Sequence, residues 1–217
     1  MKRISTIFCL IAALALSIGA ASVLASHGAD DPANHDAGEN ACLSPTGGDD
    51  DATDDNGGTA DNSGSNDVSA ADHGSDGADD MEGTDGANDD SGNGGDDVID
   101  GNGGDDDLNG DQGDDDLCGD QGDDTVNGGS GDDDISGGPG ADDLNGGSGN
   151  DDVSGDAGND DITGGKGKDI LTGNRGKDTI HARDGRTDRV NCGAGNDTVK
   201  ADTEDHVSKN CEHVKRS

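Results

Sequence analysis

The sequence predicts an all-β protein built from stacked repeats, and three observations support this prediction. First, ten nine-residue units run without a gap over residues 92–181, each with Gly at positions one and four, Asp at position six and an aliphatic residue at position eight. Second, six of the ten aliphatic residues are β-branched, which favours strands, whereas each Gly destabilises a helix by about 1 kcal/mol. Third, position two is always Gly, Asn or Asp, which tolerate a left-handed backbone. Each unit is therefore predicted to form a six-residue turn and a three-residue strand with one inward side chain.

The composition rules out an ordinary large hydrophobic core. Trp and Tyr are absent, apolar residues make up 26% of the chain, and the net charge is −38, a combination typical of disorder. A fold must therefore combine many small apolar contacts with something that neutralises charge. Because residues 26–165 contain no Lys or Arg, nucleic acid is excluded as a direct partner and anionic membranes are repelled. The expected partner is a multivalent cation.

With these positions defined, the repeats resemble a known family. They match the nonapeptide G-G-x-G-x-D-x-U-x of RTX, or hemolysin-type, calcium-binding repeats, closely over residues 92–181 and loosely over residues 74–91. The resemblance implies a right-handed parallel β-roll in which two units form one coil and the strands stack into two facing sheets. It also implies that Ca²⁺ binds between one turn and the next turn on the same side.

The resemblance assigns two sets of calcium ligands. The carboxylates at position six are Asp97, Asp106, Asp115, Asp124, Asp133, Asp142, Asp151, Asp160, Asp169 and Asp178. The backbone carbonyls at position one are those of Gly92, Gly101, Gly110, Gly119, Gly128, Gly137, Gly146 and Gly155. Ten units contain eight pairs that lie two units apart, which predicts about eight or more Ca²⁺ ions.

Elementary electrostatics supports a cation at these positions. Carboxylates stacked about 4.8 Å apart repel each other by about 0.8 kcal/mol per neighbour even at the dielectric constant of water. Ca²⁺ is a hard cation that accepts six to eight oxygen ligands in flexible geometry, which suits carboxylates and carbonyls from two turns. The alternative is an acidic solenoid without metal.

Two segments precede the repeats. Residues 1–25 have a positively charged start, an apolar stretch and small residues before the expected cleavage point, which predicts a secretory signal peptide; a retained membrane anchor is the alternative. Residues 26–73 are acidic and of low complexity, and we expect them to be disordered, as a solvated tail or a weak binder of cations. The mature chain is therefore expected to be extracellular and without a membrane span.

Residues 182–217 are predicted to form a C-terminal cap of degenerate repeats. The motif D-x-V recurs there at shrinking spacing and ends as E-x-V, which is typical of a tapering cap; a disordered basic tail is the alternative. Cys192 and Cys211 lie close together in this module, so we expect a disulfide between them. Cys42 and Cys118 then remain, either as a second disulfide or as two free thiols.

No motif indicates catalysis. The four Glu residues close no EF-hand loop, no phosphate-binding loop is present, and the six His residues show no H-E-x-x-H pattern. The prediction is a non-enzymatic, secreted calcium-binding protein with a structural, cell-surface or matrix role. Two alternatives are a secretion or targeting module that acts with a partner exoenzyme, and an extracellular Ca²⁺ buffer or mineral-associated polyanion.

Strand alternation adds one expectation about the outer surface. If position eight points inward, the neighbouring position seven points outward. Outer rows of carboxylates are then predicted on both sheets, comprising Asp116, Asp134 and Asp152 on one sheet and Asp107, Asp143 and Asp161 on the other.

Overall fold

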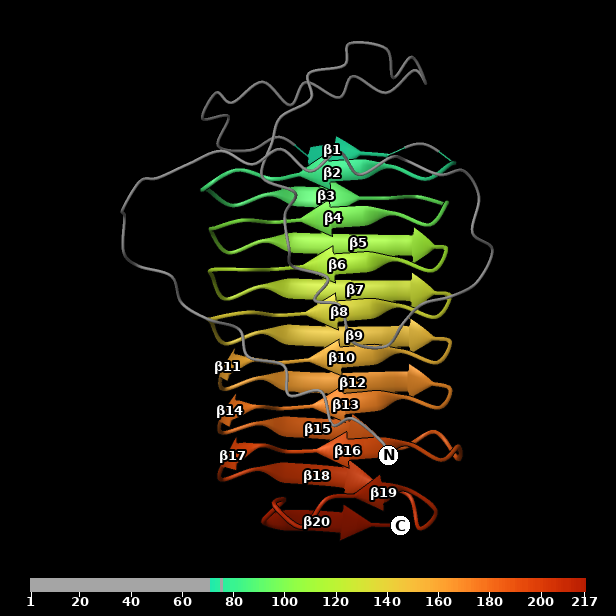
Figure 1. Ribbon diagram of the computed structural model, residues 1–217, viewed down its shortest axis with the longest axis vertical. Helices are drawn as coiled ribbons and strands as arrows, with labels where there is room; N and C mark the ends of the chain where they lie inside the picture. Colours follow the sequence, from blue (N-terminus) through green and yellow to red (C-terminus); the bar gives the residue numbers. More distant parts are fainter. Residues whose placement is uncertain (1–70, 75) are drawn as a thin grey trace, which may run out of the picture. The chain divides into compact units, whose positions relative to one another are not determined.

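The computed structural model describes residues 71–74 and 76–217, which form one stack of short β-strands joined by turns (Figure 1). In this part of the chain no helix is present that is long and apolar enough to cross a membrane. The expected signal peptide, nearly all of the acidic segment and Cys42 lie outside the described residues, so the statements about them stay predictions.

The strands form two main sheets and one small sheet, and every pairing between strands is parallel. The nine-stranded sheet has the order β1 (Ala71–His73), β3 (Asp89–Ser91), β5 (Asp107–Gln112), β7 (Thr125–Ser130), β9 (Asp143–Ser148), β12 (Asp161–Lys166), β15 (Thr179–Ala182), β18 (Thr198–Ala201) and β20 (His213–Arg216). The eight-stranded sheet has the order β19 (His206–Val207), β16 (Arg189–Asn191), β13 (Ile170–Thr172), β10 (Asp152–Ser154), β8 (Asp134–Ser136), β6 (Asp116–Cys118), β4 (Val98–Asp100) and β2 (Asp80–Glu82). The small sheet consists of β11 (Ala157–Gly158), β14 (Arg175–Gly176) and β17 (Ala194–Gly195).

Consecutive units alternate between the two main sheets, so two nine-residue units complete one coil. Leu108 accordingly pairs with Val126, and Leu117 pairs with Ile135, each eighteen residues further along the chain. This register confirms the predicted parallel β-roll, in which the sheets face each other across a narrow core.

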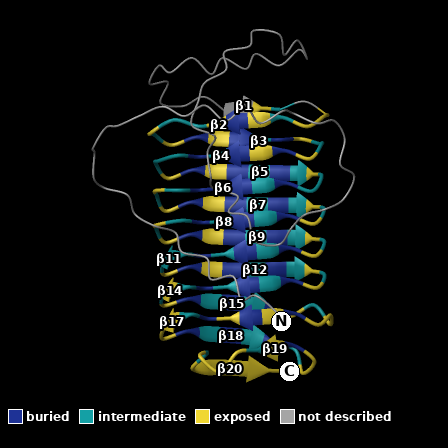
Figure 2. Ribbon diagram, viewed as in Figure 1, coloured by how far each residue is buried: buried dark blue, intermediate teal, exposed yellow. Residues whose placement is uncertain are grey.

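The core consists of two parallel rows of aliphatic side chains, which are the position-eight residues of the two sheets. All ten are at most 1% exposed, and they run along the middle of the stack between the two sheets (Figure 2). Each buried aliphatic side chain contributes about 1.5–3 kcal/mol. Towards the N-terminal end the core contains fewer aliphatic side chains, because position eight is the buried carboxylate Asp90 in one unit and Met81 in the unit before it.

From β5 onward, the strands of the nine-stranded sheet are longer than the predicted three residues, whereas β1 and β3 have three. The strand β5 continues to Gln112, and Asp111 and Gln112 pair with Gly129 and Ser130 of β7. The prediction of three-residue strands is correct for β4, β6, β8, β10 and β13 of the opposite sheet. The extension arises because turns stack on turns as closely as strands stack on strands, so the pairing runs on into the turn.

The expected left-handed backbone at position two is present in every strict repeat. All ten residues have φ between 58° and 106°, whether the residue is Gly, Asn or Asp. This conformation costs little for Gly and is tolerated by Asn and Asp, which explains the residue types at this position.

The coils continue through the C-terminal module. Val190, Val199, Val207 and Val214 of the recurring D-x-V and E-x-V motifs each pair with the position-eight residue, or its equivalent, of the preceding coil on their sheet. The predicted disulfide between Cys192 and Cys211 is present. At the edge, Arg216 donates from Nη1 to the carbonyl of Asp202 at 2.7 Å, which ties the exposed strand β20 to the preceding turn.

Candidate metal sites

The acidic residues at position six form two continuous columns, one along each side of the stack of turns. Within a column, the backbone N–H of one residue donates to Oδ1 of the equivalent residue in the next coil, as from Asp115 to Asp133 at 3.0 Å. The first column comprises Asp79, Asp97, Asp115, Asp133, Asp151, Asp169, Asp188 and Asp205. The second column comprises Asn88, Asp106, Asp124, Asp142, Asp160, Asp178, Asp197 and Glu212.

In twelve of these residues, the second carboxylate oxygen has no hydrogen-bond partner. Oδ2 is buried and unpartnered in all ten Asp residues of the strict repeats and also in Asp188 and Asp197, and all twelve residues are at most 2% exposed. A buried carboxylate without compensation is costly, so twelve equivalent oxygens in two rows indicate a repeated cation site.

Backbone carbonyls converge on these oxygens. A methyl group added at Gly110 would lie 2.3 Å from Oδ2 of Asp115 and 2.7 Å from the carbonyl oxygen of Gly128 in the next coil. The two oxygens therefore face the same side of the Gly110 backbone. Only Gly fits at position one, because a Cβ atom would collide with both oxygens.

Position four shows a second close approach. Gly131 has φ of 143°, and a Cβ atom there would lie 1.6 Å from the carbonyl oxygen of Gly113 in the preceding coil. The invariant Gly at this position thus allows turns to stack directly on each other. Turn-on-turn stacking brings the carbonyl oxygens of successive coils to the columns.

Burial makes the position-six carboxyl groups of the strict repeats, and that of Asp188, difficult to ionise in the metal-free fold. Desolvation is the largest cause and raises the pKa of Asp124, Asp133, Asp151, Asp160 and Asp188 to about 7. The N–H donated by the preceding coil opposes this shift, and neighbouring carboxylates add to it. A cation bound beside Oδ2 would offset the desolvation and remove the repulsion between coils.

The donor set fits Ca²⁺ better than a transition metal. Among residues 71–74 and 76–217, no group of three or more His, Cys, Asp or Glu side chains is placed to hold a metal ion by itself. A site in a column must therefore take many of its ligands from backbone carbonyls. Ca²⁺ accepts such all-oxygen, partly carbonyl surroundings, whereas structural Zn²⁺ sites use Cys and His side chains.

The ten Asp residues predicted as ligands lie in the columns, and the eight Gly residues predicted as ligands lie beside them in the same turns. The sequence analysis did not assign two further equivalents, Asp188 and Asp197. They are nineteen residues beyond Asp169 and Asp178, because an inserted residue breaks the nine-residue spacing. The D-x-V motif was the signal that could have identified them.

One of the extra turns joins the column to the disulfide. A methyl group at Gly173 would lie 2.5 Å from Oδ2 of Asp178 and 2.8 Å from the carbonyl oxygen of Cys192. Cys192 thus supplies the carbonyl that Gly supplies in the strict repeats, so the second column continues into the cap.

The predicted outer rows of carboxylates are also in register. Asp116, Asp134 and Asp152 pair in sequence along the eight-stranded sheet. Asp143 pairs with Asp161 on the other sheet, and Thr125 separates Asp107 from Asp143.

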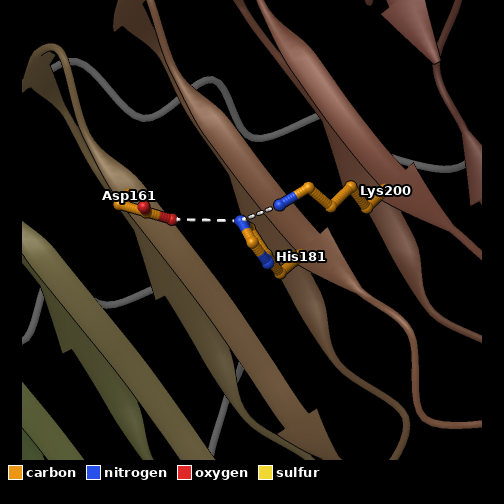
Figure 3. Close-up of polar contacts among 3 residues, drawn as sticks. All are labelled: Asp161, His181 and Lys200. Carbon is orange, nitrogen blue, oxygen red and sulfur yellow. Dashed lines mark hydrogen bonds and ion pairs between the residues drawn. The ribbon is translucent and has the colours of Figure 1, made fainter. Parts of the chain in front are cut away.

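The acidic row on the nine-stranded sheet meets basic groups near its C-terminal end. His181 of β15 lies between Asp161 of β12 and Lys200 of β18 (Figure 3). Its Nε2 atom is 3.3 Å from Oδ1 of Asp161 and 3.1 Å from Nζ of Lys200. The outer row of carboxylates on this sheet therefore ends at Asp161, beside His181 and Lys200.

Comparison with known proteins agrees with this geometry. The family model described as "RTX calcium-binding nonapeptide repeat (4 copies)" matches residues 91–117, 119–153 and 154–187. A search of curated proteins and a search of solved structures returned no match.

Proposed function

We propose that the protein binds Ca²⁺ in both columns and depends on these ions to fold. The premise is that residues 91–187 are RTX calcium-binding repeats folded as a parallel β-roll. The observation that carries the proposal is the set of twelve buried and unpartnered Oδ2 atoms. The Asp residues at position six and the carbonyls at position one would hold the ions, and Asp188, Asp197 and the carbonyl of Cys192 extend this set into the cap.

Calcium binding and folding should be one process. Each strict unit buries one aliphatic side chain, which contributes about 1.5–3 kcal/mol, while every one of its nine residues loses conformational freedom. The columns add desolvation and repulsion among carboxylates. The free energy of ion binding must therefore supply the stability that the core lacks.

A calcium titration followed by far-ultraviolet circular dichroism tests the proposal. In chelator at neutral pH the chain should show little β structure, and strand signal should appear cooperatively at about 10⁻⁴–10⁻³ M Ca²⁺, the range of extracellular calcium modules. Mg²⁺ at equal concentration serves as the control and should not induce the transition, because it demands rigid octahedral geometry and dehydrates reluctantly. A full β signal in chelator at pH 8 would contradict the proposal.

The proposed setting is extracellular, with a structural or surface role and no catalytic step. The signal-like residues 1–25 support this setting. Intact mass of the protein recovered from the medium tests it, because cleavage after Ala25 leaves Ser26 at the N-terminus. A full-length, membrane-retained product would favour an anchor instead.

The outer rows of carboxylates favour a second candidate function, adsorption to calcium-bearing surfaces. The row on the nine-stranded sheet is exposed, and the row on the eight-stranded sheet is half-buried. Position seven faces outward in both sheets, and its Asp residues play no part in the columns. Binding of the folded protein to a calcium mineral, compared with a variant that lacks these carboxylates, distinguishes this role from simple solubility. Co-purification with an exoenzyme would instead favour a targeting module.

A further inference from the structure

One turn of the second column has a side-chain amide where the strict repeats have a carboxylate with an unpartnered oxygen. Asn88 lies at position six in the second column, where each strict repeat has Asp, and it is 7% exposed. A methyl group at Gly83 would lie 3.0 Å from Nδ2 of Asn88 and 2.8 Å from the carbonyl oxygen of Gly101. The amide nitrogen thus occupies the position that Oδ2 of an Asp occupies in the other coils.

The amide nitrogen of Asn88 gathers oxygens from two successive coils. Nδ2 donates to the carbonyl of Gly86 at 2.5 Å, Oδ1 of Asp106 at 3.1 Å, the carbonyl of Gly101 at 3.3 Å and the carbonyl of Thr84 at 3.4 Å. Three of these oxygens are backbone carbonyls and one is a carboxylate oxygen, which is the donor set expected around Ca²⁺.

The oxygen of the same amide is also satisfied. Oδ1 of Asn88 accepts from the backbone N–H and from the hydroxyl of Thr84, both at 3.2 Å. These two donors determine the orientation of the amide, since the reversed orientation would place the NH₂ group against the N–H of Thr84. The nitrogen therefore faces the oxygen cluster.

We propose that the Asn88 amide replaces Ca²⁺ at the N-terminal end of the second column. This inference rests on the proposed calcium binding. The two N–H bonds direct partial positive charge at oxygens that a cation would otherwise bind, and the amide leaves no room for an ion among them. The turn of residues 83–88 is held to the next coil by hydrogen bonds, and the first ion of this column binds one coil further, beside Asp106.

The first column begins differently. Its equivalent turn carries Asp79, and a methyl group at Gly74 would lie 2.7 Å from both Oδ2 of Asp79 and the carbonyl oxygen of Gly92. This turn keeps the carboxylate and carbonyl arrangement of the strict repeats. The unit that begins the first column thus keeps Asp at position six and the apolar Met81 at position eight, whereas the unit that begins the second column has Asn88 and Asp90 at these positions.

Counting tightly bound ions by native mass spectrometry of the calcium-loaded, full-length protein tests the inference. Asn88→Asp restores a carboxylate and should bind one more Ca²⁺ than the wild type. Asn159→Asp is the matched control, because it adds the same charge at an exposed turn position where Oδ1 only accepts an N–H, and it should leave the count unchanged. Equal counts for wild type and Asn88→Asp would overturn the inference.

A second measurement keeps the test decisive if Asn88→Asp fails to fold. In the calcium-loaded wild type, the side-chain NH₂ protons of Asn88 should exchange with solvent at least tenfold more slowly than those of the exposed Asn150. Exchange as fast as that of Asn150 would overturn the inference. A wild type that binds no Ca²⁺ at all would instead refute the proposed function.

Discussion

Neighbouring acidic residues in the same turn have different surroundings in this protein. Asp132 is exposed and Asp133 is 2% exposed, although they are adjacent, identical and both part of a ladder of hydrogen bonds. Oδ1 of Asp132 accepts from the N–H of Asn150 in the next coil, whereas Oδ1 of Asp133 accepts from the N–H of Asp115 in the preceding coil. Position five therefore faces water and position six faces the column. Burial, rather than residue type, separates a solvated carboxylate from a candidate ligand.

The largest expected effect of this difference is a pH dependence of the metal-free chain. Because burial raises the pKa of Asp115 from 3.8 to about 6 and that of Asp124 and Asp133 to about 7, the folded state binds more protons than the unfolded chain between these values. The metal-free roll is thus stabilised at low pH and loses this stability as pH rises through about 6 to 7. Lowering the pH from 8 to 5 in metal-free buffer should increase β structure measured by circular dichroism.

Asn substitutions provide the control for the pH experiment. Replacing Asp133 and Asp151 with Asn removes two titrating groups of the first column and should weaken the pH dependence. The same change at the exposed Asp96 and Asp132 serves as the control. The titration stays above the isoelectric point of about 4.1, where the chain is still soluble. A β signal independent of pH between 5 and 8 would contradict the description of the columns.

The second prediction compares the two neighbours directly. Asp133→Ala removes a carboxylate at the middle of the first column, and leaving a buried ion without its partner costs about 3–5 kcal/mol. If this cost is shared among about eight bound ions, the Ca²⁺ concentration at which half of the chains are folded should rise roughly two- to threefold. Asp132→Ala should change the midpoint little, since exposed charges contribute about 0–1 kcal/mol. Equal shifts for both variants would mean that Ca²⁺ condenses on a polyanion without specific sites.

The third prediction concerns the cap, where a covalent bond supports the coils. The Cys192–Cys211 disulfide closes a loop of about 20 residues, worth roughly 3 kcal/mol. Cys192→Ser combined with Cys211→Ser should raise the Ca²⁺ midpoint by up to about twofold, while the β content at saturation stays the same. Loss of all calcium-induced structure would show instead that the cap is required for folding.

The smallest expected effect is on the outer surface. Replacing Asp107, Asp116, Asp134, Asp143, Asp152 and Asp161 with Thr should keep the calcium-loaded fold, because Thr favours strands and Thr125 already lies in the same row. Adsorption to a calcium mineral should fall if these rows bind surfaces. Adsorption equal to that of the wild type would leave them a role in solubility alone.

The local pattern of the sequence was sufficient for much of the fold. The nine-residue pattern predicted the strands, the inward position of residues such as Leu108 and Ile135 and the left-handed backbone at position two. These features depend on contacts within one unit, so the pattern determines them. The two columns of carboxylates were implied by the resemblance to RTX repeats, in which two units form one coil. The pairing of Cys192 with Cys211 was predictable because both lie in one short module.

Only the stacking of coils decided the remaining features. The extension of β5 to Gln112, the unpartnered oxygens of Asp188 and Asp197, and the amide of Asn88 in place of a carboxylate all depend on groups seventeen to nineteen residues apart. An inserted residue or a degenerate unit hides that register in the sequence, but backbone hydrogen bonds between coils restore it in the structure. The sequence therefore determined which residues form a coil. The stacking of the backbone determined which carboxylate oxygens lack a hydrogen-bond partner and are candidates to bind a cation.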